Sequence, residues 1–322
     1  MLASCKPVRA IEPPVRGRLH PRQGQGQRLA WAVACCVAAV GLGAGVARAE
    51  TCQLRIDGPP PSVQVDYDPF VPATAPSKMT FRMMNPGAEA CAIDLALTER
   101  PGEPTVQPVV ADTGLMLELR PAGLLRRTPV PGVFAVTVPA GETVEASLDV
   151  VVMTDAVVQA GQYAQELTLE LRPAGSAVAY DQAPVVLTLI ALPRAQMNLS
   201  GARGDFGTGA SVSVVDFGRA ETGKVRQVFV QTRANNAARL TFTSANRGRL
   251  MLVGENPDQA TLDYTVALED QVLDLSQVAT RDIDPPRTYA GQAFELLLTL
   301  GKVEGARAGD YSDELTIEIS TL

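Results

Sequence analysis

The chain contains one segment twice. Residues 160–173 read AGQYAQELTLELRP and residues 308–321 read AGDYSDELTIEIST, with identical residues at seven positions. Beyond each tyrosine, apolar and polar residues alternate, which predicts a strand with one buried and one solvated face. Val65-Asp66-Tyr67 and Val215-Asp216-Phe217 form a second matching pair, 95 and 93 residues ahead of the repeated segment. Two copies of more than 100 residues predict tandem globular domains rather than an array of short repeats.

Residues 1–49 have the features of an export signal. Six basic residues precede an apolar run from Leu29 to Val46, and Ala47-Arg48-Ala49 fits the small-x-small pattern of a cleavage site. We therefore predict a signal peptide over 1–49 and export through the inner membrane. A lipoprotein and a retained membrane anchor are the alternatives.

Removing this leader makes the chain strongly acidic. It takes seven of the 28 basic residues and one of the 35 acidic residues, which leaves 21 against 34 and a net charge of −13. No basic patch is visible, so nucleic acid is not expected as a partner. The single histidine, His20, also lies in the leader. Histidine-based catalysis and histidine–metal sites are thereby excluded from the mature chain, and we expect no metal and no cofactor.

Two of the five cysteines, Cys52 and Cys91, follow the predicted cleavage site. In an oxidising compartment such a pair predicts a disulfide. It would join the start of the mature chain to a strand 39 residues further on, and would stabilise the fold by about 3–4 kcal/mol in the chain-entropy model. The chain has no CxxC motif, so a redox site is not expected.

Short alternating runs between proline and glycine turns predict an all-β sandwich or barrel in each half. The predicted domains cover 50–193 and 210–322, joined by a polar, glycine-rich linker over 194–209. The predicted strands of the first domain are 62–66, 78–83, 92–97, 115–119, 133–138, 143–152, 165–171 and 185–192. Those of the second are 211–217, 225–231, 239–244, 250–253, 262–268, 293–300 and 314–319.

The two halves differ after the repeated segment. In the first half the chain continues into the apolar run 184–192 (PVVLTLIAL), whereas in the second half only Leu322 follows. We therefore expect the second domain to lack its final strand.

These segments resemble a known family. The ending AGDYSDELTIEI, the motif Val215-Asp216-Phe217-Gly218 and Tyr67-Asp68-Pro69-Phe70 after an N-terminal cysteine are similar to the spore coat protein U / FanG domains of archaic chaperone–usher pilus subunits. The resemblance covers roughly residues 50–322. It implies two tandem immunoglobulin-like β-sandwich domains, the second with an open groove that accepts a donor strand.

The family also implies partners. A periplasmic chaperone would cover the groove, and the next pilus subunit, assembled at an outer-membrane usher, would then fill it. Leu315, Ile317 and Ile319 would lie beside the inserted strand. The mature chain begins Glu50-Thr51-Cys52, without an alternating donor segment. A subunit that accepts but does not donate belongs at the end of the fibre, so we expect a two-domain tip adhesin that passes through the periplasm to the cell surface.

The surface ligand cannot be deduced. Candidate adhesive loops carry Met83 and Met84, and Leu124 and Leu125, because apolar groups there have no evident core role. Ordinary core or loop packing is the alternative for all four residues.

Three other functions are alternatives to a pilus subunit. A self-contained envelope or surface-binding protein would complete its second domain internally. A periplasmic pilus chaperone also has two immunoglobulin-like domains, but the acidity and the early disulfide speak against it. An exported enzyme would depend on a carboxylate pair, and no feature singles one out among 34 acidic residues. We therefore expect no enzymatic activity.

Overall fold

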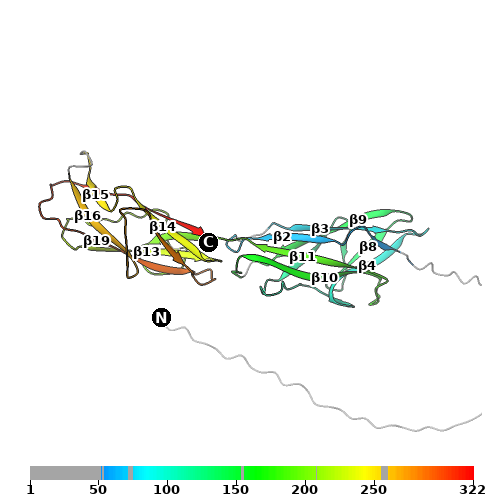
Figure 1. Ribbon diagram of the computed structural model, residues 1–322. Coiled ribbons are helices and arrows are strands. Elements are labelled where there is room, and N and C mark those ends of the chain that lie inside the picture. The colour runs from blue at the N-terminus through cyan, green and yellow to red at the C-terminus, as the bar shows by residue number, and fades with distance from the viewer. Residues whose placement is uncertain (1–51, 53, 72–74, 154–155, 208, 255–259) are drawn as a thin grey trace, which may run out of the picture. The chain divides into compact units, whose positions relative to one another are not determined.

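The computed structural model describes residues 52, 54–71, 75–153, 156–207, 209–254 and 260–322, and every regular element in it is a β-strand (Figure 1). The predicted all-β fold with two sandwiches is thus confirmed. Within these ranges there is no helix with the length and hydropathy needed to cross a membrane. The predicted signal peptide, residues 1–49, lies outside the described residues.

Strands β1 to β11 form the first sandwich. Its smaller sheet has the order β1-β3-β9-β6, made of β1 Arg55–Asp57, β3 Ser77–Met84, β9 Thr143–Val152 and β6 Leu117–Ala122. Its larger sheet has the order β2-β11-β10-β4-β8-β7, with β5 paired to β4. These strands are β2 Ser62–Tyr67, β11 Asp181–Ala191, β10 Gly161–Pro173, β4 Cys91–Arg100, β8 Val133–Val138, β7 Arg126–Arg127 and β5 Glu103–Pro104.

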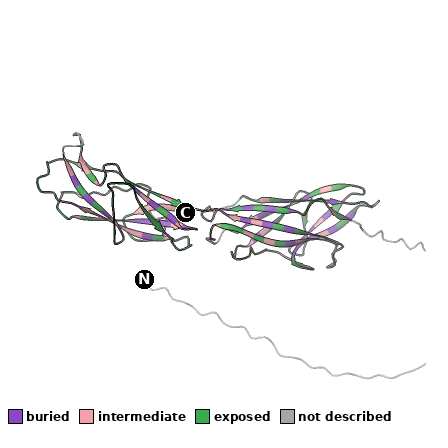
Figure 2. Ribbon diagram, in the orientation of Figure 1, coloured by how far each residue is buried: buried purple, intermediate pink, exposed green. Residues whose placement is uncertain are grey.

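The core of the first sandwich lies between these two sheets. Side chains alternate between the faces of each strand, so every second residue points inward. In β2 the buried residues are Val63, Val65 and Tyr67, and Figure 2 shows the same alternation of buried and exposed positions along the other strands. Burying one large apolar side chain contributes roughly 1.5–3 kcal/mol. The alternation in the sequence therefore fixes which face of each strand packs inward.

Strands β12 to β21 form the second sandwich. Its larger sheet has the order β12-β13-β19-β16-β15-β20, with β17 paired to β16. These strands are β12 Ala195–Ser200, β13 Val225–Ala234, β19 Gln292–Leu300, β16 Thr261–Leu268, β15 Arg249–Leu252, β20 Tyr311–Ser312 and β17 Gln271–Leu273. The smaller sheet has the order β18-β14-β21, made of β18 Ala279–Ile283, β14 Ala238–Ser244 and β21 Leu315–Thr321.

The segment predicted as a linker, 194–209, begins with a strand. Residues 195–200 form β12, which pairs antiparallel with β13. The glycines and polar residues around the sequence AQMNLS predict a linker, whereas its alternating Ala195, Met197 and Leu199 pack against the core of the second sandwich. The Arg203-Gly204-Asp205 tripeptide that follows also packs on this sheet, since Arg203 lies 5.3 Å from the Phe229 ring and Gln231 donates a hydrogen bond to the Gly204 carbonyl.

Candidate functional site

The two sandwiches share most of their strand pairing. The order β1-β3-β9-β6 of the first matches β12-β13-β19-β16 of the second, and β8-β4-β10 matches β18-β14-β21. Strand β10 contains the first copy of the repeated segment, and β20 and β21 contain the second copy. The sandwiches can therefore be compared position by position.

The comparison places a free edge at β21. In the first sandwich, β10 pairs with β4 on one side and with β11 on the other. In the second, β21 pairs with β14 on one side. No strand in the described part of the chain pairs with its other side. A row of backbone N–H and C=O groups is left there for another strand to pair with.

Strand β11 shows what occupies this position in the first sandwich. It runs antiparallel to β10 over eleven residue pairs and parallel to β2 over six. Its inward side chains Val185, Leu187 and Leu189 are buried in the core. Strand β11 thus closes the first sandwich by joining β10 to β2.

The counterpart of β2 in the second sandwich is not a strand. The sequence predicted a strand over 211–217, and this prediction was wrong, because these residues pair with no described strand. Only Ala210, immediately before them, forms a bridge with Leu199 of β12. Val65 and Tyr67 are fully buried, whereas their counterparts Val215 and Phe217 are only partly buried. Val214 is 89% exposed. Residues 211–217 therefore have the apolar alternation of β2, but no described strand corresponding to β11 covers them.

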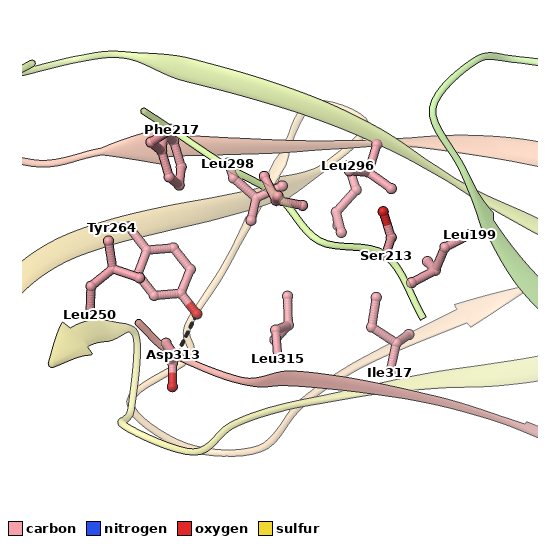
Figure 3. A pocket seen from close by; sticks show the side chains of 12 residues that line it. Leu199, Ser213, Phe217, Leu250, Tyr264, Leu296, Leu298, Asp313, Leu315 and Ile317 are labelled. Carbon is pink, nitrogen blue, oxygen red and sulfur yellow. Dashed lines mark hydrogen bonds between the residues drawn. The ribbon is translucent and has the colours of Figure 1, made fainter. Parts of the chain in front are cut away.

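A pocket opens between this segment and β21 (Figure 3). Its volume is about 130 Å³, close to the roughly 150 Å³ of an apolar cavity that can hold benzene. Leu315 and Ile317 point into it from β21, as Figure 3 shows. The remaining lining residues come from residues 213–217, from β12, β13, β15, β16 and β19, and from the link between β20 and β21, and are Leu199, Ser213, Val215, Phe217, Val228, Leu250, Tyr264, Leu296, Leu298 and Asp313. The pocket can therefore accept one large apolar side chain.

One end of the pocket is polar. Asp313 Oδ2 accepts hydrogen bonds from the Tyr264 and Ser244 hydroxyls, both at 2.6 Å, and its Oδ1 accepts one from the Asn246 backbone N–H at 2.9 Å. Burial and the bond to Asp313 raise the pKa of Tyr264 above its ordinary value. The phenol therefore stays protonated and donates to Asp313 throughout the physiological pH range. These bonds hold the chain where it leaves β20 and enters β21.

The predicted groove residues are placed as follows. Leu315 and Ile317 line the pocket, and Ile319 is partly buried further along β21, where it pairs with Leu240 of β14. The sequence did not identify Tyr264 or Ser213 as groove residues, because both come from segments far from the repeat. Asp313 lies inside the repeated segment, but its carboxylate partners could not be read from the sequence.

Met83 and Met84 lie in a strand and not in an exposed loop, so the alternative of core packing applies to Met83. Met83 is fully buried in β3 and Met84, the last residue of that strand, is partly buried. The alternation of SKMTFRMM places Met79, Phe81 and Met83 together on the inner face. Leu125 is also buried, and only Leu124 is exposed among the four candidates.

A second hollow, of about 200 Å³, lies on the first sandwich. The exposed side chains of Val106 and Val130 line it, beside Glu118 and Arg127. Its residues belong to the segments 106–107, 118–119 and 127–134. Val106 and Val130 are therefore exposed apolar residues in a mixed polar and apolar hollow, unlike the buried Met83 and Leu125.

A disulfide joins Cys52 to Cys91, whose Cα atoms lie 5.5 Å apart. Cys91 is the first residue of β4. The bridge therefore ties the segment ahead of β1 to the larger sheet of the first sandwich.

The first sandwich also buries one ion pair. Glu170 Oε2 accepts hydrogen bonds from Arg172 at 2.7 and 3.0 Å, and Oε1 accepts them from Thr98 and the Gly102 backbone N–H. Burial alone would raise the pKa of Glu170, but these hydrogen bonds outweigh it and lower the pKa below its ordinary value. All these bonds are internal to the sandwich, so the pair has a structural role. Across the described ranges no group of three or more His, Cys, Asp or Glu side chains is placed to hold a metal ion.

Comparison with known proteins gave structural similarities only. No family model and no curated protein sequence matches the chain. Structures of chaperone–usher tip adhesins are among those it resembles. One is the CsuC–CsuE chaperone–tip adhesion subunit complex from archaic Csu pili of Acinetobacter baumannii, at 10% identity and a TM-score of 0.43, covering 83% of this chain and 99% of that one.

Two further adhesins show similar values. The CfaE adhesin of enterotoxigenic E. coli is 11% identical with a TM-score of 0.37, over 83% of this chain and 94% of that one. The CupB6 tip adhesin of Pseudomonas aeruginosa is 11% identical with a TM-score of 0.31, over 83% and 93%. All three TM-scores are below 0.5, so these similarities do not assign a function to the chain.

Proposed function

We propose that this protein is an exported structural and adhesive subunit of a chaperone–usher pilus, located at the tip, which accepts a donor strand from the next subunit. The open position between β21 and residues 211–217 carries the proposal. The first sandwich fills the same position with its own β11. A strand from another subunit would close the second sandwich by pairing with β21, as β11 closes the first by pairing with β10.

The partners follow from the exposed edge. An apolar groove beside unpaired backbone groups promotes aggregation unless it is covered. In the periplasm a chaperone would cover it, and at the outer-membrane usher the next subunit would replace the chaperone by strand addition. The protein would then remain at the cell surface as part of the pilus.

The tip position is supported by the difference between the two sandwiches. The first is closed by β11 and tied by the Cys52–Cys91 disulfide, so it is free to face outward and recognise a surface. The second has the open edge and faces the fibre. The recognised ligand is unknown, and the hollow beside Val106 and Val130 is a better candidate surface than Met83 or Leu125. We propose no enzymatic activity.

The experiment measures hydrogen exchange and thermal unfolding of the exported protein with and without a peptide that copies β11 (DQAPVVLTLIA). We expect rapid exchange at residues 211–217 and along β21 in the free protein. The peptide should slow the exchange at both segments and raise the melting temperature of the second sandwich. Slow exchange at 211–217 without peptide, and no effect of the peptide, would instead support a self-contained envelope protein.

A further inference from the structure

The outward face of the free edge carries two carboxylates. Glu314 precedes β21 and Glu318 lies within it, and both are exposed. Neither forms an ion pair among the described residues. Arg239, on the neighbouring strand β14, is already engaged by Asp282 at 2.6 and 3.0 Å. The free edge therefore has uncompensated negative charge beside the apolar pocket.

The first sandwich compensates one of these two charges internally. Glu170 occupies the position that Glu318 has in the second copy of the repeat, and Glu170 is paired with Arg172. In the second copy Ser320 stands where the first has Arg172. The cation that neutralises this glutamate has thus been replaced by a neutral residue in the copy with the open edge.

The register of β11 shows which residues of an incoming strand would meet these groups. In the first sandwich Val185 is opposite Leu167, Gln182 is opposite Glu170, and Val186 is opposite Glu166. Residues directly opposite in an antiparallel pair point to the same face of the sheet. A strand in the same register would therefore place one inward residue at Leu315, one outward residue at Glu318 and one at Glu314.

We propose that the groove selects a donor segment with basic residues at those two outward positions. The segment runs antiparallel to β21. It carries apolar residues opposite Leu315 and Ile317, the two β21 residues that line the pocket. Its basic residues stand three positions before and one position after the residue that faces Leu315. This inference rests on the proposed function and adds a charge rule to it.

The physical reason is cross-strand pairing. Opposite charges directly across an antiparallel pair stabilise it, and like charges destabilise it. The apolar inward residues supply most of the affinity by burial in the pocket, and this contribution is the same for strands that carry the same inward residues. The outward charges then discriminate between strands that have the same inward pattern.

The test uses three peptides and the exported full-length protein. The first copies residues 181–191 with Gln182→Lys and Val186→Lys, and the second carries Gln182→Glu and Val186→Glu. The third has the composition of the first in an order that destroys the alternation. We expect the lysine peptide to bind about three- to tenfold more tightly than the glutamate peptide, and the third not to bind.

Two protein variants separate local pairing from overall charge. Glu318→Lys should abolish or reverse the preference for the lysine peptide. The matched control, Glu89→Lys, makes the same charge change at an exposed site on the first sandwich and should leave the preference intact.

Each outcome decides between the two proposals. Equal affinities for the two alternating peptides, or equal effects of Glu318→Lys and Glu89→Lys, overturn the charge rule and leave strand acceptance standing. If no alternating peptide binds or slows hydrogen exchange at β21, strand acceptance fails and the charge rule fails with it.

Discussion

Leu167 and Leu315 occupy the same position in the two copies of the repeated segment, yet Leu167 is only 4% exposed whereas Leu315 remains partly buried at the edge of an open pocket. The difference between them is strand β11. It pairs Val185 with Leu167, and no described strand does the same for Leu315.

Truncating these two leucines should therefore have different effects. Leu167→Ala should destabilise the first sandwich by about 2–5 kcal/mol, because it leaves a cavity in a closed core. Leu315→Ala should cost the free protein less, since its side chain already borders a pocket. Denaturant unfolding of the two variants checks this, and equal losses would contradict it.

The variants Leu315→Ala and Leu167→Ala also test whether the second sandwich binds a donor strand beside β21. Leu315→Ala should weaken binding of the β11 peptide, because it removes apolar surface that the peptide would bury. Leu167→Ala serves as the control and should leave peptide binding unchanged. Titration calorimetry measures both.

Replacing Cys52 and Cys91 together by serine should lower the stability of the first sandwich by about 2–5 kcal/mol. The second sandwich contains no cysteine and should unfold as before. Calorimetric unfolding of the double variant, compared with the oxidised protein, measures the two transitions. A loss confined to the second sandwich would contradict the assignment of the bridge.

The Glu170–Arg172 pair should make the first sandwich sensitive to acid. Because the folded-state pKa of Glu170 is lowered, the carboxylate contributes stability that is present above its unfolded pKa, about 4.3. This contribution is lost as the pH falls through the folded pKa. Unfolding free energies between pH 3 and 7 should therefore fall less steeply in Glu170→Gln than in the unmodified protein. Parallel curves would show that the pair does not drive the acid response.

Substitutions at Met83 and at Leu124 should differ in their effect on the stability of the first sandwich. Met83→Ala should destabilise the first sandwich by roughly 2–5 kcal/mol, because the side chain is fully buried. Leu124→Ser, at an exposed position, should change stability by about 0.5 kcal/mol or less. Thermal unfolding distinguishes them, and a stable Met83→Ala variant would contradict the burial.

Most strands could be predicted from the alternation of polar and apolar residues, because this alternation matches the two faces of a strand. The repeat also pointed to β21 as the strand beside the missing one. Alternation alone misjudged residues 211–217, since a strand exists only when a partner supplies hydrogen bonds. Alternation does place Met83 on the inner face of its strand, together with Met79 and Phe81, so its selection as an adhesive residue disregarded that pattern.

The polar end of the pocket could not be predicted, for a different reason. Asp313, between β20 and β21, meets Ser244 of β14 and Tyr264 of β16 only after these segments have come together. Such a contact depends on the three-dimensional pairing of distant segments, and no spacing in the sequence encodes it. Strand β12 was missed although Ala195, Met197 and Leu199 alternate with polar residues, because this six-residue run adjoins the glycine-rich segment that follows it.

The open edge at β21 has a consequence for the lifetime of an assembly. A strand that enters a sandwich in the place of β11 becomes part of the core, and its departure requires the edge of that sandwich to unfold. Such a link breaks at the rate of protein unfolding, which can be as slow as days. A fibre joined in this way would withstand dilution and pulling forces because its connections are, in kinetic terms, folded domains.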